Sequence, residues 1–314
     1  MTKDLNKVQK KIFSSEFKSF CKRQFSKDMK SLEEERKKAL LFSLAIALGI
    51  TIGFLAVFFL FGEYASSDMK NGMLASYVFF VAFSLIPINK YKKKSKNTIM
   101  PKLLAFVGDF QFVDTYDKRN SIINHVNSLK LFNNYNSVDI DDVLEGTYKN
   151  TNVSISEICL KYKYTSSNNQ KRESIVFDGI LLSFKSFKNF KSRTLIKSEH
   201  IKIFKNSKQV NLEDPEFEKI YDVESEDQIE ARYLITPAFM NRMVEYSKSN
   251  KAGKITVSFE NANVNIAVHS TKNWFDVPIL KPATDVSIYT GILFDLILIL
   301  KIIDALKMDQ NIGM

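Results

Sequence analysis

Cysteine is scarce in this chain, and that scarcity excludes the sites that depend on it. The 314 residues include only two cysteines, Cys21 and Cys159, which lie far apart and form no CxxC pair. This spacing excludes a disulfide framework and a cysteine-based zinc site, and it fits a reducing compartment. Cys159 lies in the alternating stretch ISEICLKY, where we interpret it as a buried structural thiol rather than a nucleophile.

Linear motifs of catalysis are also missing. The sequence contains no GxxxxGK[ST], GxGxxG, HExxH, GxSxG or EF-hand pattern, and these are the short signatures of nucleotide, metalloprotease, hydrolase and calcium sites. The three histidines, His125, His200 and His269, are scattered among different predicted elements. The acidic stretch EDPEFEKIYDVESEDQIEAR we interpret mainly as exposed surface. We therefore predict no catalytic residues, no cofactor and no metal site.

Charge is absent from two apolar runs near the N-terminus. Leu41–Phe61 and Gly72–Ile88 contain no charged residue, and about 20 apolar residues suffice for a helix to cross the hydrocarbon core. We predict a transmembrane hairpin over 41–89, with spans at 41–62 and 72–88 and a short external loop. A buried hairpin of soluble core helices is the alternative. A signal peptide fits less well, because a long polar segment precedes the first run and no small-residue cleavage site follows it.

The basic residues around these runs predict their orientation. The loop Glu63–Asn71 contains a single basic residue, Lys70, whereas both outer flanks are rich in lysine and arginine. Since positive residues stay on the cytoplasmic side of short loops, we expect both termini and the main domain to be cytoplasmic. The flanking residues are Lys22, Arg23, Lys27, Lys30, Arg36, Lys37 and Lys38 before the first run, and Lys90, Lys92, Lys93, Lys94 and Lys96 after the second.

Residues 1–40 and 90–107 are predicted to be cytoplasmic helices on either side of the hairpin. In the first, apolar residues from Phe13 to Leu32 recur at spacings of four, three, five, four and three, which describe one helical stripe with a slip. This helix either lies on the bilayer surface or packs against the helix that follows the second run, and we favour packing. In the second, a basic juxtamembrane helix, we expect an interruption near Pro101.

Residues 108–314 are predicted to form a cytoplasmic α+β domain, in which a largely antiparallel sheet packs with a mid-chain helix and a C-terminal helix. Short runs rich in Val, Ile, Tyr, Phe and Thr alternate here with turn residues, as strands require. We expect hairpins that turn at Asn150–Asn152 and Asn261–Asn263, a strand pair bent at Gly179, and a strand over Glu226–Leu234. Thr236-Pro237 is expected to open the mid-chain helix.

The apolar C-terminal segment Ser287–Met308 is predicted to be a buried amphipathic helix. A third membrane span is disfavoured, because a charge at mid-bilayer costs about 2.5 kcal/mol or more and the segment contains Asp295, Lys301 and Asp304.

Basic residues interleave with phenylalanines between Phe184 and Lys208. We favour a hairpin with phenylalanines in the core and lysines in water. Binding to anionic lipid or to a protein partner is the alternative, and single-stranded nucleic acid, which such patterns can bind through stacking, is not expected. With the lysines after the second run, this stretch supplies the candidate lipid or partner contacts: Lys90, Lys92, Lys93, Lys94, Lys96, Lys188, Lys191 and Arg193.

The block EDPEFEKIYDVESEDQIEARYLITPAFMNRM resembles the hallmark segment of a bacterial family of membrane-anchored proteins that carry a domain of unknown function. The stretch VFDGILLSFKSFKNFKSRTLI and the C-terminal helix are similar to that family too, so the resemblance covers essentially the whole chain. Ser192 departs from the pattern, since relatives often have glycine there. The hallmark positions, to which we assign a structural role, are Asp214, Pro215, Phe217, Asp227, Arg232, Tyr233, Thr236 and Pro237.

The resemblance implies an N-terminal helix, two transmembrane helices and a cytoplasmic α+β domain in the bacterial inner membrane. It implies no catalytic residues, and it suggests a membrane-anchored coiled-coil partner of the LemA type. Within the hallmark, Arg232 would be costly to bury alone in a strand, so we expect it to pair with Asp214 or Asp227.

These features predict a membrane-anchored cytoplasmic module for binding or scaffolding, which engages a protein partner or an anionic lipid surface. The alternative is a membrane-tethered enzyme whose site no linear motif reveals. A deep pocket with convergent Arg, His and carboxylate groups would favour the enzyme, and a shallow surface with a basic rim would favour the module. Homo-oligomerisation stays open.

Overall fold

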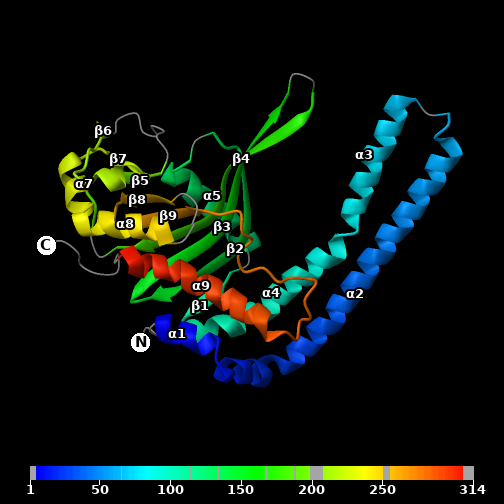
Figure 1. Cartoon of the computed structure of the whole chain (residues 1–314), viewed down its shortest axis with the longest axis horizontal. Coiled ribbons are helices and arrows are strands. Elements are labelled where there is room, and N and C mark those ends of the chain that lie inside the picture. Colours follow the sequence, from blue (N-terminus) through cyan, green and yellow to red (C-terminus); the bar gives the residue numbers. More distant parts are fainter. Residues whose placement is uncertain are drawn as a thin grey trace. The chain divides into compact units, whose positions relative to one another are not determined.

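The computed structural model describes residues 5–64, 66–113, 115–132, 134–166, 169–186, 189–198, 208–249 and 255–306. The chain divides into two compact units (Figure 1). The β unit comprises Met1–Gln9, Leu104–Phe275 and Leu293–Met314, and the helical unit comprises Lys10–Leu103 and Asp276–Ile292.

The helices that precede the sheet differ in their bounds from the predicted ones. The predicted N-terminal helix and the first apolar run form one helix of 47 residues, α2. The second run is divided, because α3 ends at Phe83 and α4 begins at Ile86. Pro87 accounts for the break, since its ring nitrogen has no hydrogen to donate to the preceding turn. The helices are α1 (Leu5–Ile12), α2 (Ser15–Phe61), α3 (Ser67–Phe83) and α4 (Ile86–Val107).

The N-terminal part of α2 packs against α4 within the helical unit. Most of its apolar stripe, from Phe17 to Leu32, is buried, whereas Phe13 is exposed. Lys94 Nζ lies 2.6 Å from Glu35 Oε1, and Lys102 pairs with Asp28. The stripe slips where Phe25 has non-helical angles, φ −131° and ψ 17°. The five-residue spacing therefore marks a real break in the helix.

The predicted interruption near Pro101 is wrong, because α4 continues through that residue to Val107. Proline removes one helical hydrogen bond, here to the carbonyl of Asn97. Both Asn97 and Pro101 are exposed, so water can reach the carbonyl and the helix tolerates the loss.

The predicted α+β class is confirmed by a nine-stranded sheet in which every pairing is antiparallel. The spatial order is β1-β2-β3-β4-β9-β8-β5-β7-β6. The strands are β1 (Phe110–Phe112), β2 (Ser137–Tyr148), β3 (Thr151–Thr165), β4 (Lys171–Lys185), β5 (Thr194–Lys197), β6 (Lys208–Gln209), β7 (Asp222–Ser225), β8 (Ile255–Glu260) and β9 (Asn263–His269). The helices are α5 (Thr115–Leu129), α6 (Pro215–Glu218), α7 (Gln228–Leu234), α8 (Pro237–Ser249) and α9 (Val286–Leu306).

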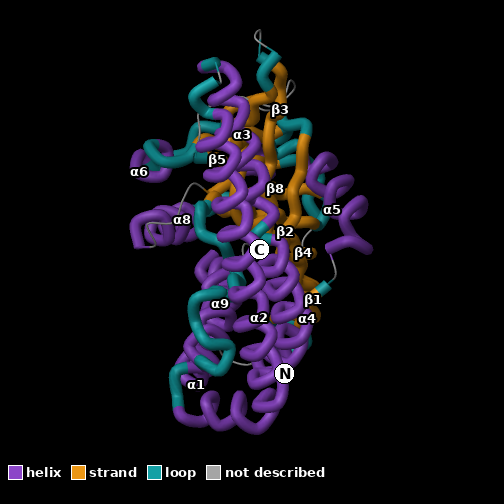
Figure 2. Tube along the Cα trace, turned by 90° about the vertical axis from the view of Figure 1, so that its right-hand side faces the viewer, coloured by secondary structure: helices purple, strands orange, loops and turns teal. Residues whose placement is uncertain are grey.

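Helices cover both faces of the sheet. On one face α5 packs over an apolar cluster (Figure 2). On the other, Phe239 of α8 meets Phe259 of β8, and Tyr148 of β2 donates a hydrogen bond of 2.8 Å to Asp304 of α9. The cluster under α5 includes Ile122, Val126, Leu129, Val143, Ile158, Leu160, Phe177 and Leu181.

Several local predictions differ from the structure in instructive ways. The β2–β3 turn falls at Lys149-Asn150 and the β8–β9 turn at Asn261-Ala262, where all four residues have positive φ. The stretch around Gly179 is one strand, β4, rather than a pair. The predicted strand over Glu226–Leu234 is wrong, because that segment forms α7.

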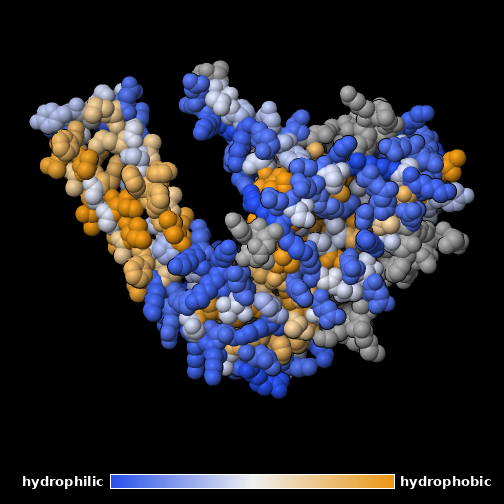
Figure 3. Space-filling model, turned by 180° about the vertical axis from the view of Figure 1, so that it is seen from behind, coloured by the Kyte–Doolittle hydropathy of each residue, from blue (hydrophilic) through white to orange (hydrophobic). Residues whose placement is uncertain are grey.

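Within the residues that the structure describes, three helical stretches are long and apolar enough to cross a membrane, one more than predicted. They differ in how much of their most apolar window is buried inside the protein: none in α2, 6% in Ser67–Val107 and 61% in α9. Figure 3 shows apolar side chains gathered over α2 and α3. These features indicate association with a membrane.

Candidate functional site

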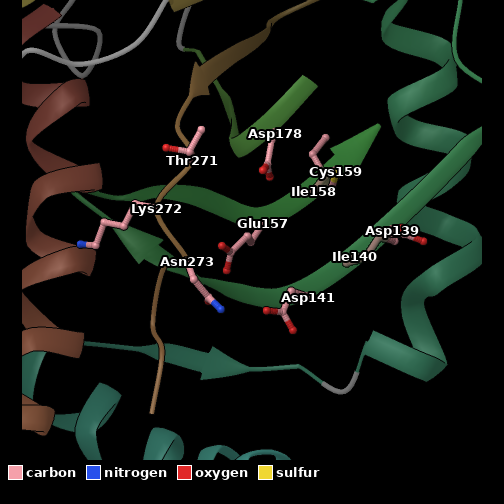
Figure 4. Close-up of a pocket in the computed structure, with 10 residues that line it drawn as sticks. All are labelled: Asp139, Ile140, Asp141, Glu157, Ile158, Cys159, Asp178, Thr271, Lys272 and Asn273. Carbon is pink, nitrogen blue, oxygen red and sulfur yellow. The ribbon is translucent and has the colours of Figure 1, made fainter. Parts of the chain in front are cut away.

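An acidic hollow of about 380 Å³ lies on the sheet face that α9 covers (Figure 4). Strands β2, β3 and β4 form its floor, and the segment that follows β9 forms its rim. Its lining residues are Asp139, Ile140, Asp141, Glu157, Ile158, Cys159, Asp178, Thr271, Lys272 and Asn273.

The strand register explains why acidic residues meet here. Asp139 of β2 lies opposite Cys159 of β3, which lies opposite Asp178 of β4. Glu157 is two residues from Cys159 and therefore points to the same face. Three strands thus each contribute a carboxylate to one small area.

A β-bulge in β2 adds two more carboxylates. Pairing with β3 shifts between Ile140 and Val143, so Asp141 and Asp142 lie in the bulge. Bulges re-aim side chains and are frequent beside active sites. Carboxylate oxygens of Asp141, Asp142 and Glu157 lie within 4.8 Å of one another.

Two of these carboxylates are buried and one of them is held by the rim. Asp142 is 1% exposed and Glu157 is 8% exposed. The backbone N–H of Trp274 donates to Glu157 Oε1 at 2.9 Å. A buried charge is costly without such a partner. The hydrogen bond from Trp274 therefore stabilises Glu157 and holds the rim segment against the floor of the hollow.

Gly179 positions the rim on the sheet. Its φ of 151° suits glycine, and a Cβ there would overlap the carbonyl oxygen of Val268 in β9. The adjacent N–H of Ser270 donates to the carbonyl of Asp178 at 2.8 Å. Close approach of β4 and β9 at this point therefore requires glycine.

The two lysines near the hollow are both paired with carboxylates, and the lining itself contains four carboxylates and one lysine. Lys272 bonds to Asp295 of α9 and lies 4.5 Å from the Trp274 ring centroid. Lys161 lies 3.1 Å from Asp139 and 3.5 Å from Glu173. The hollow consequently has a negative potential.

Cys159 lines the hollow and is only partly buried, so the prediction of a buried thiol is wrong. Burial raises the pKa of this thiol, and the negative charges of Asp178 and Asp139 raise it further. A raised pKa keeps the thiol protonated at neutral pH, and only the thiolate is a strong nucleophile. The interpretation of Cys159 as a residue without a nucleophilic role therefore agrees with its surroundings.

The chemistry open to the hollow is the binding of a cation or a cationic group. Carboxylate oxygens are ligands for Ca²⁺ and Mg²⁺, and Asp141, Asp142 and Glu157 are the described residues close enough together to share an ion. The lining contains carboxylates and one lysine, Lys272, and has no histidine or arginine.

The two described histidines, His125 and His269, are not among the lining residues of this hollow. His125 Nε2 lies 3.1 Å from Ser183 Oγ, and burial lowers the pKa of His125. The His269 ring packs edge-on against Phe177 at 5.8 Å. His200 lies outside the described residues.

Four of the eight candidate lipid or partner contacts are paired or buried within the fold. Lys92 pairs with Asp276 at 2.9 Å, Lys94 pairs with Glu35, and Lys96 is buried. Arg193 is 8% exposed, and its Nε lies 3.6 Å from Glu260.

Four of these candidates are exposed. They are Lys90, Lys93 and Lys191, together with Lys94 despite its ion pair, and Lys188 lies outside the described residues. The described candidates therefore differ in exposure and in pairing.

Five of the eight hallmark positions stand at the starts of helices. Asp214 accepts hydrogen bonds from the N–H groups of Glu216 and Phe217 at the start of α6. Asp227 does the same for α7, and Thr236 Oγ1 accepts from Phe239 N at 3.3 Å in α8. Pro215 and Pro237 are first residues of their helices. Phe217 is buried against Tyr221 at 5.1 Å, so this block orders the β7 edge of the sheet.

The expected pairing of Arg232 with Asp214 or Asp227 is wrong. Arg232 is exposed on α7, and both aspartates are occupied in capping their own helices. Because α7 is a helix and not a strand, Arg232 points into water and needs no partner. Tyr233 beside it is 72% exposed.

Part of the chain is similar to a protein family of unknown function. A family model described as "Protein of unknown function (DUF3137)" matches residues 175–308. No curated protein matches the chain. The crystal structure of the mycobacterial trehalose monomycolate transport factor A, TtfA, is 13% identical over 52% of this chain and 74% of that chain, with a TM-score of 0.28. Residues 175–308 are therefore similar, by the family model, to a family of unknown function.

Proposed function

We propose that the protein is a two-span protein of the bacterial cytoplasmic membrane whose β unit is a cytoplasmic binding module. One observation carries the proposal: none of the most apolar window of α2 is buried inside the protein. Phe59 is 81% exposed and Leu41 68% exposed. Such a continuous apolar surface is stable in lipid and not in water.

The contacts between α2 and α3 support a membrane hairpin. Thr51 Oγ1 and Tyr77 Oη lie 3.2 Å apart, and the rings of Phe54 and Tyr77 are 4.6 Å apart. Polar contacts of this kind hold helices together in lipid, where apolar burial supplies no driving force. Exposed lysines at the ends of the apolar surface, Lys37, Lys38, Lys90 and Lys93, support a cytoplasmic location for those ends.

The surroundings of α9 support two spans rather than three. Most of its apolar window, 61%, is buried within the protein. Its charged residues have protein partners: Asp295 bonds to Lys272, and Asp304 lies 2.7 Å from Lys149.

Reporter fusions test the anchor and its orientation. A cytoplasmic reporter placed after Lys96 is expected to be active, and an external reporter within Glu63–Asn71 is expected to be active. Carbonate extraction should leave the protein in the membrane fraction. An active external reporter after Lys96 would overturn the orientation, and release by carbonate would overturn the anchor.

The binding role rests on the surface of the β unit. Its partner is a protein, including a coiled-coil membrane protein of the LemA type, or an anionic lipid surface. Crosslinking in membranes followed by mass spectrometry identifies a protein partner, and recovery of no specific protein would argue against one.

A membrane-tethered enzyme is the second candidate. The acidic hollow favours it, because carboxylates of Asp141, Asp142 and Glu157 converge there. The absence of a linear catalytic motif from the sequence places it second. Turnover of a substrate by the purified protein, lost in Glu157→Gln, would reverse this order.

A further inference from the structure

The hairpin of β3 and β4 extends beyond the rest of the sheet (Figure 1). The pairing of β2 with β3 ends at Ser137 and Lys161, and the pairing of β9 with β4 ends at Gly179 and His269. Residues 161–165 and 171–175, here named the ribbon, pair with each other. Within the described residues, no third strand covers 162–165 or 171–175.

The ribbon presents apolar and aromatic side chains to the solvent. Ile175 is 60% exposed, and Tyr162 and Tyr164 are each 43% exposed. The two tyrosine rings stack at 5.9 Å. A short two-stranded ribbon is only marginally stable alone in water, so exposed apolar groups here suggest a surface that receives them.

The ribbon carries a net positive charge. It carries four basic residues, Lys161, Lys163, Lys171 and Arg172, against one acidic residue, Glu173. Of these, Lys163, Lys171 and Arg172 are exposed. A surface that accepts the ribbon must therefore be anionic.

The register sorts these side chains onto two faces. Tyr162 lies opposite Ser174, and Tyr164 lies opposite Arg172, so both tyrosines and Arg172 share one face. Tyrosine is enriched at membrane interfaces, where its ring meets the acyl boundary and its hydroxyl meets the headgroups. Arginine binds phosphate through its planar, forked guanidinium.

We propose that the ribbon binds the anionic headgroup layer of the membrane, with Tyr162, Tyr164 and Arg172 facing the lipid. The proposal rests on the membrane anchor proposed above. An anchored chain keeps its β unit at the membrane, and the exposed tyrosines and net positive charge of the ribbon match the headgroup layer.

A second copy of the chain is the competing occupant, because uncovered strand edges can pair with one another. Edge pairing would bring two basic ribbons together, which like-charge repulsion opposes. An anionic lipid surface instead neutralises the same residues. Charge complementarity thus favours lipid.

Tryptophan fluorescence tests this contact in the full-length protein. The chain has one tryptophan, so Trp274→Phe with Tyr164→Trp leaves a single reporter on the ribbon. The protein is reconstituted into vesicles of phosphatidylcholine with brominated phosphatidylglycerol, or of brominated phosphatidylcholine alone. We expect bromine quenching in the anionic vesicles only. Raising the salt to 1 M shortens the Debye length to about 3 Å and should remove the quenching.

Matched variants separate this contact from other causes. Tyr233→Trp in the same background puts the reporter on another exposed tyrosine of the β unit, and it should stay unquenched. Arg172→Glu, on the same face as the tyrosines, should abolish quenching of the ribbon reporter while carbonate still leaves the protein in the membrane, which shows that the anchor is intact.

Three results would overturn the proposal. The ribbon reporter could stay unquenched in anionic vesicles, or the Tyr233→Trp reporter could be quenched equally. A blue shift of the ribbon reporter in lipid-free detergent that grows with protein concentration would assign the ribbon to a second copy.

Discussion

Asp295, near the middle of the apolar helix α9, bonds to the ammonium group of Lys272. It also accepts a hydrogen bond of 3.2 Å from the backbone N–H of Phe275. Asp295 is 7% exposed, so its charge is satisfied inside the β unit. This contact fixes the rim of the acidic hollow to α9.

Replacing Asp295 should therefore destabilise the β unit. We expect Asp295→Ala to lower the free energy of unfolding by about 3 kcal/mol, because it leaves the buried Phe275 N–H without a partner and Lys272 without its counter-ion. Denaturant titration followed by Trp274 fluorescence measures the change. Asp68→Ala, in the first turn of α3, is the control and should leave this transition unchanged. An unaltered midpoint in Asp295→Ala would contradict the contact.

The second prediction compares the effects on stability of replacing two glycines, Gly179 and Gly291, by alanine. Gly179→Ala should cost about 2 kcal/mol or more, since it forces a side chain into a strained backbone region and against the Val268 carbonyl. Gly291 lies in α9 with open space around it, so Gly291→Ala should stabilise by about 1 kcal/mol. Thermal unfolding of both variants gives the signs, and equal effects would contradict the assigned roles.

The caps of the hallmark block give a third prediction. Asp227→Ala should lower stability by about 1 kcal/mol, as expected for the loss of an N-cap, and Arg232→Ala should change it little. Because the two side chains are not paired, the double variant should show additive effects. A coupling free energy of about 1 kcal/mol would instead restore the ion pair that the sequence suggested.

The reactivity of Cys159 reports the potential of the acidic hollow. Its raised pKa leaves less thiolate at pH 8 than an ordinary cysteine has, so alkylation by iodoacetamide should be slow and should accelerate as pH rises. Cys21 is buried and its pKa is raised to about 12, so it should not react in the native protein.

The charge of Asp178 provides the matched test of that potential. Asp178→Asn removes a negative charge that raises the pKa of Cys159, so the rate at pH 8 should increase. Glu218→Gln, on α6, should leave the rate unchanged. An Asp178→Asn rate equal to that of the unmodified protein would contradict a negative hollow.

The sequence predicted the features that depend on local pattern. The apolar stripe from Phe17 to Leu32, the hairpins and the helix at Pro237 all follow from residue spacing and turn chemistry. The α7 helix was missed, although Asp227 and Glu230 form the start of a capping pattern that could have identified it. The helix α5 was missed because its sequence, TYDKRNSIINHVNSL, is largely polar.

The acidic hollow could not be predicted from the sequence. Its carboxylates come from three strands whose register is set by a bulge at Asp141-Asp142 and by the close approach at Gly179. A one-residue change of register would point them to the opposite face. Linear spacing does not contain that information.

Cysteine labelling in spheroplasts tests the membrane anchor most directly. In a Cys159→Ser background, Ser66→Cys lies between α2 and α3, and Lys93→Cys lies on α4. A membrane-impermeant maleimide should label Ser66→Cys from outside and Lys93→Cys only after permeabilisation. Labelling of Lys93→Cys in intact spheroplasts, or of Ser66→Cys only after permeabilisation, would contradict the two-span anchor with a cytoplasmic β unit.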